Sequence, residues 1–185
     1  AEKDIVRETG ESMNSKLSRS SHCEGTKPQP IAKVPSGVSG LDEILEGGFP
    51  EGRATLLCGG PGTGKSMLAL EFLYRGARDG RAGIFVAFEE RAESIRRNAL
   101  ARGWDLAALE QADKLCLLEA RVDRDAIVAG AFNIKPILAI IEGQARKMNA
   151  ACIVIDAVDV FMRIFKDHQQ EREELYGLHD WLLEN

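Results

Sequence analysis

Several features that define other protein classes are absent from this chain of 185 residues. Basic residues are in the minority, and a formal net charge of −5 argues against nucleic acid as a partner, because nonspecific binding to phosphates favours a basic surface. No apolar run approaches the ~18 residues of a membrane span, and the first residues carry no apolar signal core. We therefore expect a cytoplasmic protein with no membrane partner.

Cysteine and aromatic residues are also scarce. The four cysteines, at positions 23, 58, 116 and 152, show neither CxxC nor Cys/His metal-ligand spacing. Three of them lie in apolar runs, where a free cysteine behaves as a small buried hydrophobe, and this indicates a reducing compartment. Aromatic residues make up only 6% of the chain, while glycine occurs 18 times. This composition suits one α/β domain with an aliphatic core and many turns.

The chain changes character near Ile31. Residues 1–30 are polar and lack apolar periodicity, which predicts a flexible N-terminal extension. From 31 to 185, short apolar runs of strand type alternate with segments of helical periodicity. This alternation predicts a mostly parallel sheet with helices on both faces. The expected strands are 54–58, 84–88, 114–120 and 151–156; the expected helices are 41–45, 65–79, 92–102, 106–111, 134–149 (capped by Asn133) and 169–185.

One motif lies between the first expected strand and the helix that follows it. The residues Gly59, Gly60, Pro61, Gly62, Thr63, Gly64, Lys65 and Ser66 match the phosphate-loop pattern GxxxxGK[ST] without a mismatch. Glycines let consecutive backbone N–H groups turn toward an anion, and the helix N-terminus adds its positive dipole end. Lys65 is placed to reach the β- and γ-phosphates, and the Ser66 hydroxyl to ligate Mg²⁺. The motif predicts binding of a nucleoside triphosphate, with ATP or ADP and Mg²⁺ as cofactors.

Acidic residues follow two of the expected strands. Asp156 ends an apolar run and is placed to hold Mg²⁺ opposite Ser66. The alternative is an ordinary carboxylate at the end of a strand, which has the same sequence pattern. Asp159 lies past the strand and is the weaker candidate for the metal ligand. Glu89 and Glu90 follow another run, at the sheet edge where parallel strands deliver their carboxyl ends. These two are candidates to orient or deprotonate a water molecule, and a solvated acidic turn at a helix start is the alternative.

Five blocks of the sequence together resemble one family. Residues 35–53, 58–77, 85–90, 101–120 and 153–161 resemble, in order and spacing, the KaiC branch of the RecA-like ATPases, and most closely the first of its two ATPase domains. The resemblance implies a RecA-like P-loop core and a homohexameric ring with ATP between neighbouring subunits. It marks Glu89 and Glu90 as the catalytic carboxylates, Asp156 as the metal-side acid and the segment from Gly62 to Met67 as phosphate-binding.

The same resemblance implies a function and its alternatives. In this family the first domain hydrolyses ATP slowly and docks a small KaiB partner, here near residues 121–132, as part of a clock, timer or signalling system. The alternatives are a Ser/Thr autokinase of a full-length two-domain protein and a RecA-like DNA recombinase. Ala101 matches a position near the nucleotide base. Because the family domain is longer, we expect this chain to be C-terminally incomplete, truncated before the last strands of its domain.

Overall fold

The computed structural model describes residues 31–120, 134–162 and 168–184. The expected N-terminal extension over 1–30, the region near 121–132 expected to dock a partner and the proposed helix cap Asn133 lie outside the described residues. The architecture below is that of the chain from Ile31 onward.

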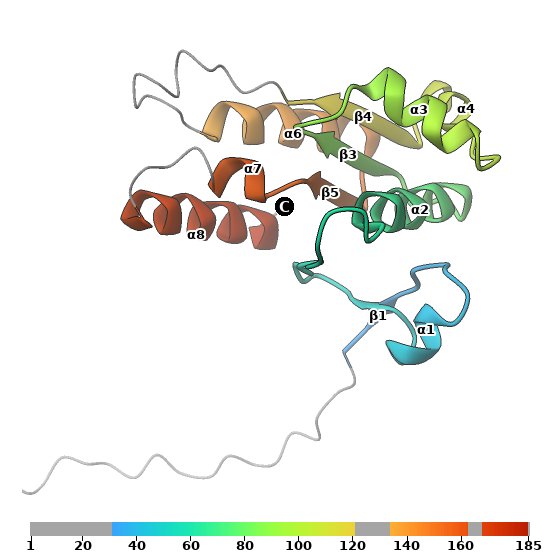
Figure 1. Ribbon diagram of the computed structural model, residues 1–185, viewed down its shortest axis with the longest axis horizontal. Helices are drawn as coiled ribbons and strands as arrows, with labels where there is room; N and C mark the ends of the chain where they lie inside the picture. The colour runs from blue at the N-terminus through green and yellow to red at the C-terminus, as the bar shows by residue number, and fades with distance from the viewer. Residues whose placement is uncertain (1–30, 121–133, 163–167, 185) are drawn as a thin grey trace, which may run out of the picture. The chain divides into compact units, whose positions relative to one another are not determined.

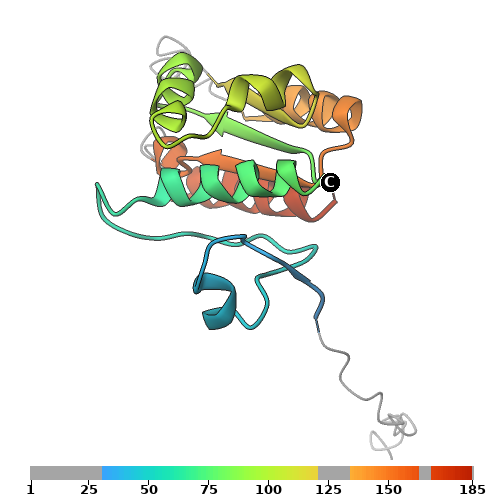
Figure 2. The ribbon, with the colours of Figure 1, turned by 90° about the vertical axis from the view of Figure 1, so that its right-hand side faces the viewer.

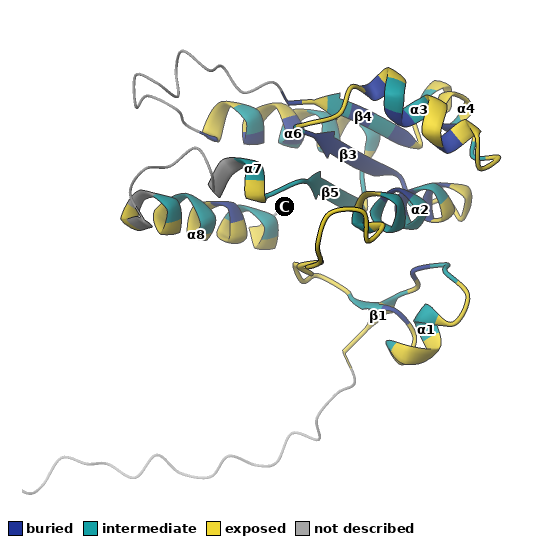
Figure 3. Ribbon diagram, in the orientation of Figure 1, coloured by how far each residue is buried: buried dark blue, intermediate teal, exposed yellow. Residues whose placement is uncertain are grey.

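A three-stranded parallel sheet lies at the centre of the domain, in the order β4-β3-β5 (Figure 1). Strand β3 (Gly83–Ala87) pairs with β4 (Leu115–Glu119) on one side and with β5 (Cys152–Asp156) on the other. Every residue of β3 is buried, as expected for a continuous apolar run in the middle of a parallel sheet (Figure 3). The prediction of these three strands is confirmed.

Helices lie against both faces of the sheet (Figures 1 and 2). Alternate side chains of β3 point to opposite faces, so Phe85 joins one apolar cluster while Ile84 and Val86 join the other. The Phe85 cluster contains residues of α2 (Lys65–Arg78), α3 (Ala92–Leu100) and α4 (Leu106–Gln111). The opposite cluster contains residues of α6 (Lys135–Met148) and α8 (His168–Glu184).

The helices begin and end close to the places that the sequence predicts. The Asp105 carboxylate accepts a hydrogen bond from the Ala108 backbone N–H at 3.0 Å and so caps α4. Pro136 lies in the first turn of α6, where its missing N–H costs nothing. One short helix, α7 (Asp159–Met162), was not expected, and it contains the alternative metal acid Asp159.

A small subregion precedes the phosphate loop. Strands β1 (Lys33–Val34) and β2 (Phe49–Pro50) pair antiparallel, and the expected short helix forms between them as α1 (Leu41–Ile44). The ring of Phe49 packs edge-on against Phe72 of α2, with the ring centroids 5.4 Å apart. This contact links the subregion to the helix that carries the phosphate loop.

The turn before α1 is organised by one carboxylate. Asp42 accepts hydrogen bonds from the backbone N–H groups of Ser36 at 2.7 Å and Gly37 at 3.1 Å. The pKa of Asp42 lies below its ordinary value of 3.8, chiefly because Ser36 donates hydrogen bonds to the charged form. Arg81 follows the end of α2, and its guanidinium group donates a hydrogen bond to the Pro35 carbonyl at 3.2 Å. The turn therefore depends on an ionised Asp42.

We expect acid to remove the contribution of Asp42 to stability. Because the folded pKa is depressed, this contribution is present above the unfolded value near 3.8 and is lost as pH falls through the lower folded pKa. Asp42→Asn should unfold at a lower urea concentration than the parent at pH 7, and the difference should shrink below pH 3.8. The matched control is Asp113→Asn, at an exposed turn; a difference for Asp42→Asn that does not vary with pH would contradict the assignment.

Among the elements expected within the described ranges, the strand over 54–58 does not form. This segment is extended, but it pairs with no strand among the described residues, and all residues from 51 to 64 are exposed (Figure 3). Leu56 is 74% exposed. Apolar β-forming residues give a segment the capacity to be a strand, yet a strand forms only when a neighbour supplies backbone partners.

Across the described ranges, no helix is both long enough and apolar enough to cross a bilayer.

Candidate functional site

The phosphate loop joins the exposed segment to the N-terminus of α2. Gly64 is the N-cap residue of α2 and has φ 89°, and Gly62 has φ 77°. Residues with a Cβ adopt this left-handed region at a cost, so these two positions of the motif favour glycine through backbone conformation. The first N–H groups of α2 are the donors that a helix leaves free for an anion.

Lys65 folds over its own loop. Its Nζ donates to the carbonyl oxygens of Gly59 at 2.8 Å and Gly60 at 2.9 Å. The Thr63 hydroxyl also donates to Gly60, at 2.9 Å. These bonds hold the ammonium group at the loop, where a bound phosphate would meet both its charge and its three donors. Ser66, the next residue along α2, is exposed.

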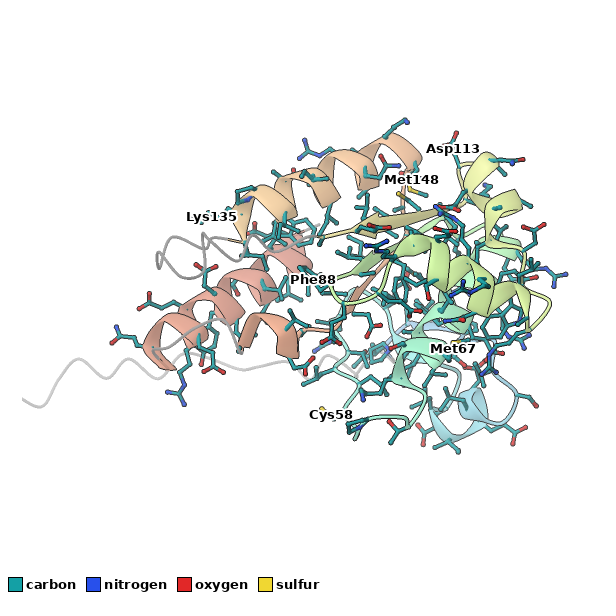
Figure 4. The ribbon with its side chains drawn as sticks, turned by 45° about the horizontal axis from the view of Figure 1, so that its top comes forward. Cys58, Met67, Phe88, Asp113, Lys135 and Met148 are labelled. Atoms are coloured by element: carbon teal, nitrogen blue, oxygen red, sulfur yellow. The ribbon has the colours of Figure 1, made fainter. Side chains whose placement is uncertain are left out.

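Three labelled residues give the orientation of this region (Figure 4). Met67 lies in the first turn of α2, Phe88 follows the end of β3, and Cys58 lies on the extended segment before the loop.

Cys58 is exposed, which corrects the expectation that it is buried. Burial raises the pKa of the Cys116 and Cys152 thiols, so both stay protonated at neutral pH and make poor nucleophiles.

The carboxyl edge of the sheet gathers acidic residues from all three strands. Asp156 ends β5 and Glu119 ends β4, and both are in register with Ala87, the last residue of β3. The Phe88 N–H donates to the Asp156 carbonyl at 2.9 Å. Glu89 and Glu90 follow directly and are exposed. The sequence-predicted acids therefore share one edge, as parallel strands require.

Glu119 is the residue at this edge that sequence reasoning missed. Glu119 lies in the expected strand 114–120, and an apolar run followed by an acid is the same signal that singles out Asp156. Its carboxylate accepts a hydrogen bond from the Ala92 backbone N–H at 2.8 Å, at the first turn of α3. Glu119 thus satisfies one of the free N–H groups of that helix and fastens α3 to the sheet.

The two adjacent glutamates have different surroundings. Glu90 accepts hydrogen bonds from the Ser94 hydroxyl at 2.7 Å and from the Asn98 side-chain amide at 2.9 Å. Glu89 has neither a hydrogen bond nor an ion pair within the described part of the chain. Ser94 and Asn98 lie four residues apart on one stripe of α3, and Glu90 precedes the helix; this spacing is the sequence signal for the network.

The donor set at this edge suits one class of metal ion. Within the ranges that the structure describes, no group of three or more His, Cys, Asp or Glu residues is arranged to hold a metal. Mg²⁺ needs no such cage, because it is usually bound through one or two protein oxygens together with substrate phosphates and water. The Ser66 hydroxyl and the Asp156 carboxylate are oxygen ligands of the type that this ion prefers.

Comparison with known proteins relates this arrangement to a family. The family model described as "ATPase: KaiC" matches residues 34–185. A circadian clock oscillator protein KaiC from Picosynechococcus is 39% identical over 150 residues, which cover 80% of this chain and 29% of that protein. Its counterpart from Parasynechococcus marenigrum is 36% identical over 156 residues, which cover 83% of this chain and 30% of that protein. The chain thus spans less than a third of the length of these clock proteins.

A solved structure extends the likeness to the fold. The crystal structure of a KaiC-like protein from Pyrococcus horikoshii matches with a TM-score of 0.73 and 37% sequence identity, covering 84% of this chain and 67% of that one. The expected RecA-like α/β core is confirmed by this match. Family model, relatives and solved structure agree, and the chain belongs to the KaiC family of ATPases.

Proposed function

We propose that this chain binds Mg²⁺ and ATP at the loop 59–66 and hydrolyses the ATP slowly, with the carboxyl edge of the sheet supplying the acids. One observation carries the proposal. A phosphate loop with Lys65 over its carbonyls and glycines in left-handed conformation opens α2, in a domain where Asp156 ends one parallel strand and Glu89 follows the end of another. This arrangement supports ATP as the substrate and Mg²⁺ as its companion ion.

Each residue has a role in the proposed reaction. Lys65 and the N–H groups up to Met67 hold the phosphates, and the Ser66 hydroxyl and Asp156 would hold Mg²⁺, which would supply positive charge against the phosphates. Glu89 orients the attacking water, and Glu90 is the second carboxylate of the pair that family membership suggests. The water oxygen bonds to the γ-phosphorus as the bond to the β,γ-bridging oxygen breaks, and the water proton passes to the Glu89 carboxylate.

A ring with nucleotide between subunits is the assembly that we propose for this site. The residues from 51 to 64 are exposed along their whole length, so a large part of the loop surface is open to a neighbour. Sedimentation of the chain with and without Mg²⁺ and a non-hydrolysable ATP analogue tests this. Assembly that depends on the analogue supports the ring, and a monomer at saturating analogue contradicts it. A small KaiB-like protein is the further partner that family membership suggests.

The fate of the γ-phosphate separates the proposal from its alternatives. The chain is incubated with ATP labelled at the γ-phosphate, and label is counted as free phosphate and as label on protein. Free phosphate is the expected result, whereas label on protein would favour the Ser/Thr autokinase of a longer protein. Binding to single-stranded DNA that weakens with salt would favour the recombinase. Some relatives are named circadian clock oscillator proteins, and we propose a role in a clock, timer or signalling system for this chain as well.

A further inference from the structure

The Glu90 side chain is turned onto α3. One carboxylate oxygen, Oε1, accepts both the Ser94 hydroxyl and the Asn98 amide, at 2.7 Å and 2.9 Å. Glu90 precedes Arg91, the N-cap residue of α3, and its two donors lie in the helix about one turn apart. A movement of this carboxylate to a water molecule at the γ-phosphate would require both bonds to break.

Helix α3 is itself firmly held. Its first turn is capped by Glu119 through the Ala92 N–H at 2.8 Å. Its inner face is packed into the core, where Ile95 is 4% exposed and Ala99 is fully buried. Arg96 forms a two-pronged ion pair with Glu110 of α4, with N–O distances of 2.6 Å and 2.9 Å. The helix is therefore a rigid support for any group bonded to it.

The bend that carries Glu89 is fastened on both sides. On the strand side, the Phe88 N–H donates to the Asp156 carbonyl at 2.9 Å. On the helix side, Glu90 is bonded to Ser94 and Asn98. Glu89 lies between these two attachments and has no hydrogen-bond or ion-pair partner of its own in the described structure. Its carboxylate is thus free to act while its backbone is held.

We propose that Glu90 is a positioning residue and not a second base: together with Ser94 and Asn98, it holds the bend after β3 so that Glu89 faces the γ-phosphate. This inference rests on the proposed function, in which Glu89 acts on the water. It gives Ser94 and Asn98 a role in holding the bend. It also separates the two glutamates: Glu89 contacts the water, and Glu90 acts through the backbone.

The test compares ATP hydrolysis by single variants of the whole chain. Asn98→Ala should lower kcat about 5-fold, as expected for the loss of one hydrogen bond, and leave KM unchanged. Glu90→Gln keeps an acceptor oxygen for Ser94 and Asn98, so its kcat should fall less than that of Glu90→Ala. The control is Arg97→Ala, on the exposed side of the same helix, which should keep the parent kcat. Thermal unfolding of each variant reports general damage.

A double-variant cycle compares the losses of hydrolysis activity in the single and double variants, a quantity that a merely structural role would not change in this way. In a Glu90→Ala background, Asn98→Ala should cost no further activity, because the bond is already absent. The inference is overturned if the two losses are additive, if Glu90→Gln is as inactive as Glu89→Gln, or if Asn98→Ala matches the parent. If the parent releases no phosphate, the proposed function fails first and the positioning role fails with it; the other outcomes overturn the positioning role alone.

Discussion

Replacing Lys65 by alanine is expected to weaken ATP binding at least ~100-fold, because a charge-assisted hydrogen bond contributes up to about 3 kcal/mol and the proposed site has this side chain contact the β- and γ-phosphates. The Lys65 ammonium already lies at the loop, bonded to the Gly59 and Gly60 carbonyls at 2.8 Å and 2.9 Å. It needs only a short side-chain rearrangement to exchange these carbonyls for phosphate oxygens. Calorimetric titration with a non-hydrolysable ATP analogue measures the change.

The control for Lys65→Ala is Lys114→Ala, at an exposed turn before β4. This variant removes the same charge from the chain and should bind the analogue as the parent does. The removed lysine also bonds to its own loop, so the far-ultraviolet circular dichroism and unfolding midpoint of Lys65→Ala should accompany the titration. Parent-like affinity in a folded Lys65→Ala protein would contradict the phosphate-loop assignment.

Glu89→Gln is expected to retain ATP but hydrolyse it about 10²–10⁴-fold more slowly than the parent, the range that loss of a general base produces. The amide has nearly the shape of the carboxylate, so nucleotide binding should be preserved. It cannot take the proton of the attacking water. Single-turnover release of labelled phosphate measures the chemical step, and analogue titration measures binding.

Two further variants serve as comparisons for Glu89→Gln. Glu43→Gln, on the short helix α1, removes an exposed carboxylate remote from the sheet edge and should leave the rate unchanged. The double variant Glu89→Gln/Glu90→Gln should also bind ATP and stall. Phosphate release at the parent rate by Glu89→Gln would show that another group acts on the water.

The central sheet and its helices are predictable from the sequence because their signals are local. The run Ile84–Val86 is apolar without a break, and this pattern is typical of a strand buried on both faces. Pro136 and Asp105 mark helix starts through their own backbone chemistry. By contrast, the segment 54–58 has the residues of a strand, but pairing depends on a neighbour that a local pattern cannot reveal.

The residue types of the candidate site can be predicted from the sequence more readily than its contacts. The phosphate-loop motif predicts Lys65 from its spacing. The positions of Glu89 and Asp156 at or just after the apolar runs predict both acids from chain order. The capping of Ala92 by Glu119 spans 27 residues of sequence, so it depends on the register of the sheet. In the network of Glu90, Ser94 and Asn98, the last two share a stripe of α3, yet polar residues at this spacing are common on exposed helix faces.

The most direct test of the account is an NMR titration of the ¹⁵N-labelled chain with Mg²⁺ and a non-hydrolysable ATP analogue. Each amide reports its own surroundings, so the site is located without any mutation. The largest shifts are expected at the amides of Gly62, Gly64, Lys65 and Ser66, with smaller shifts at Glu89 and none along α8. Saturating analogue that leaves the loop amides unmoved, or that shifts a different surface most, would contradict nucleotide binding at the phosphate loop.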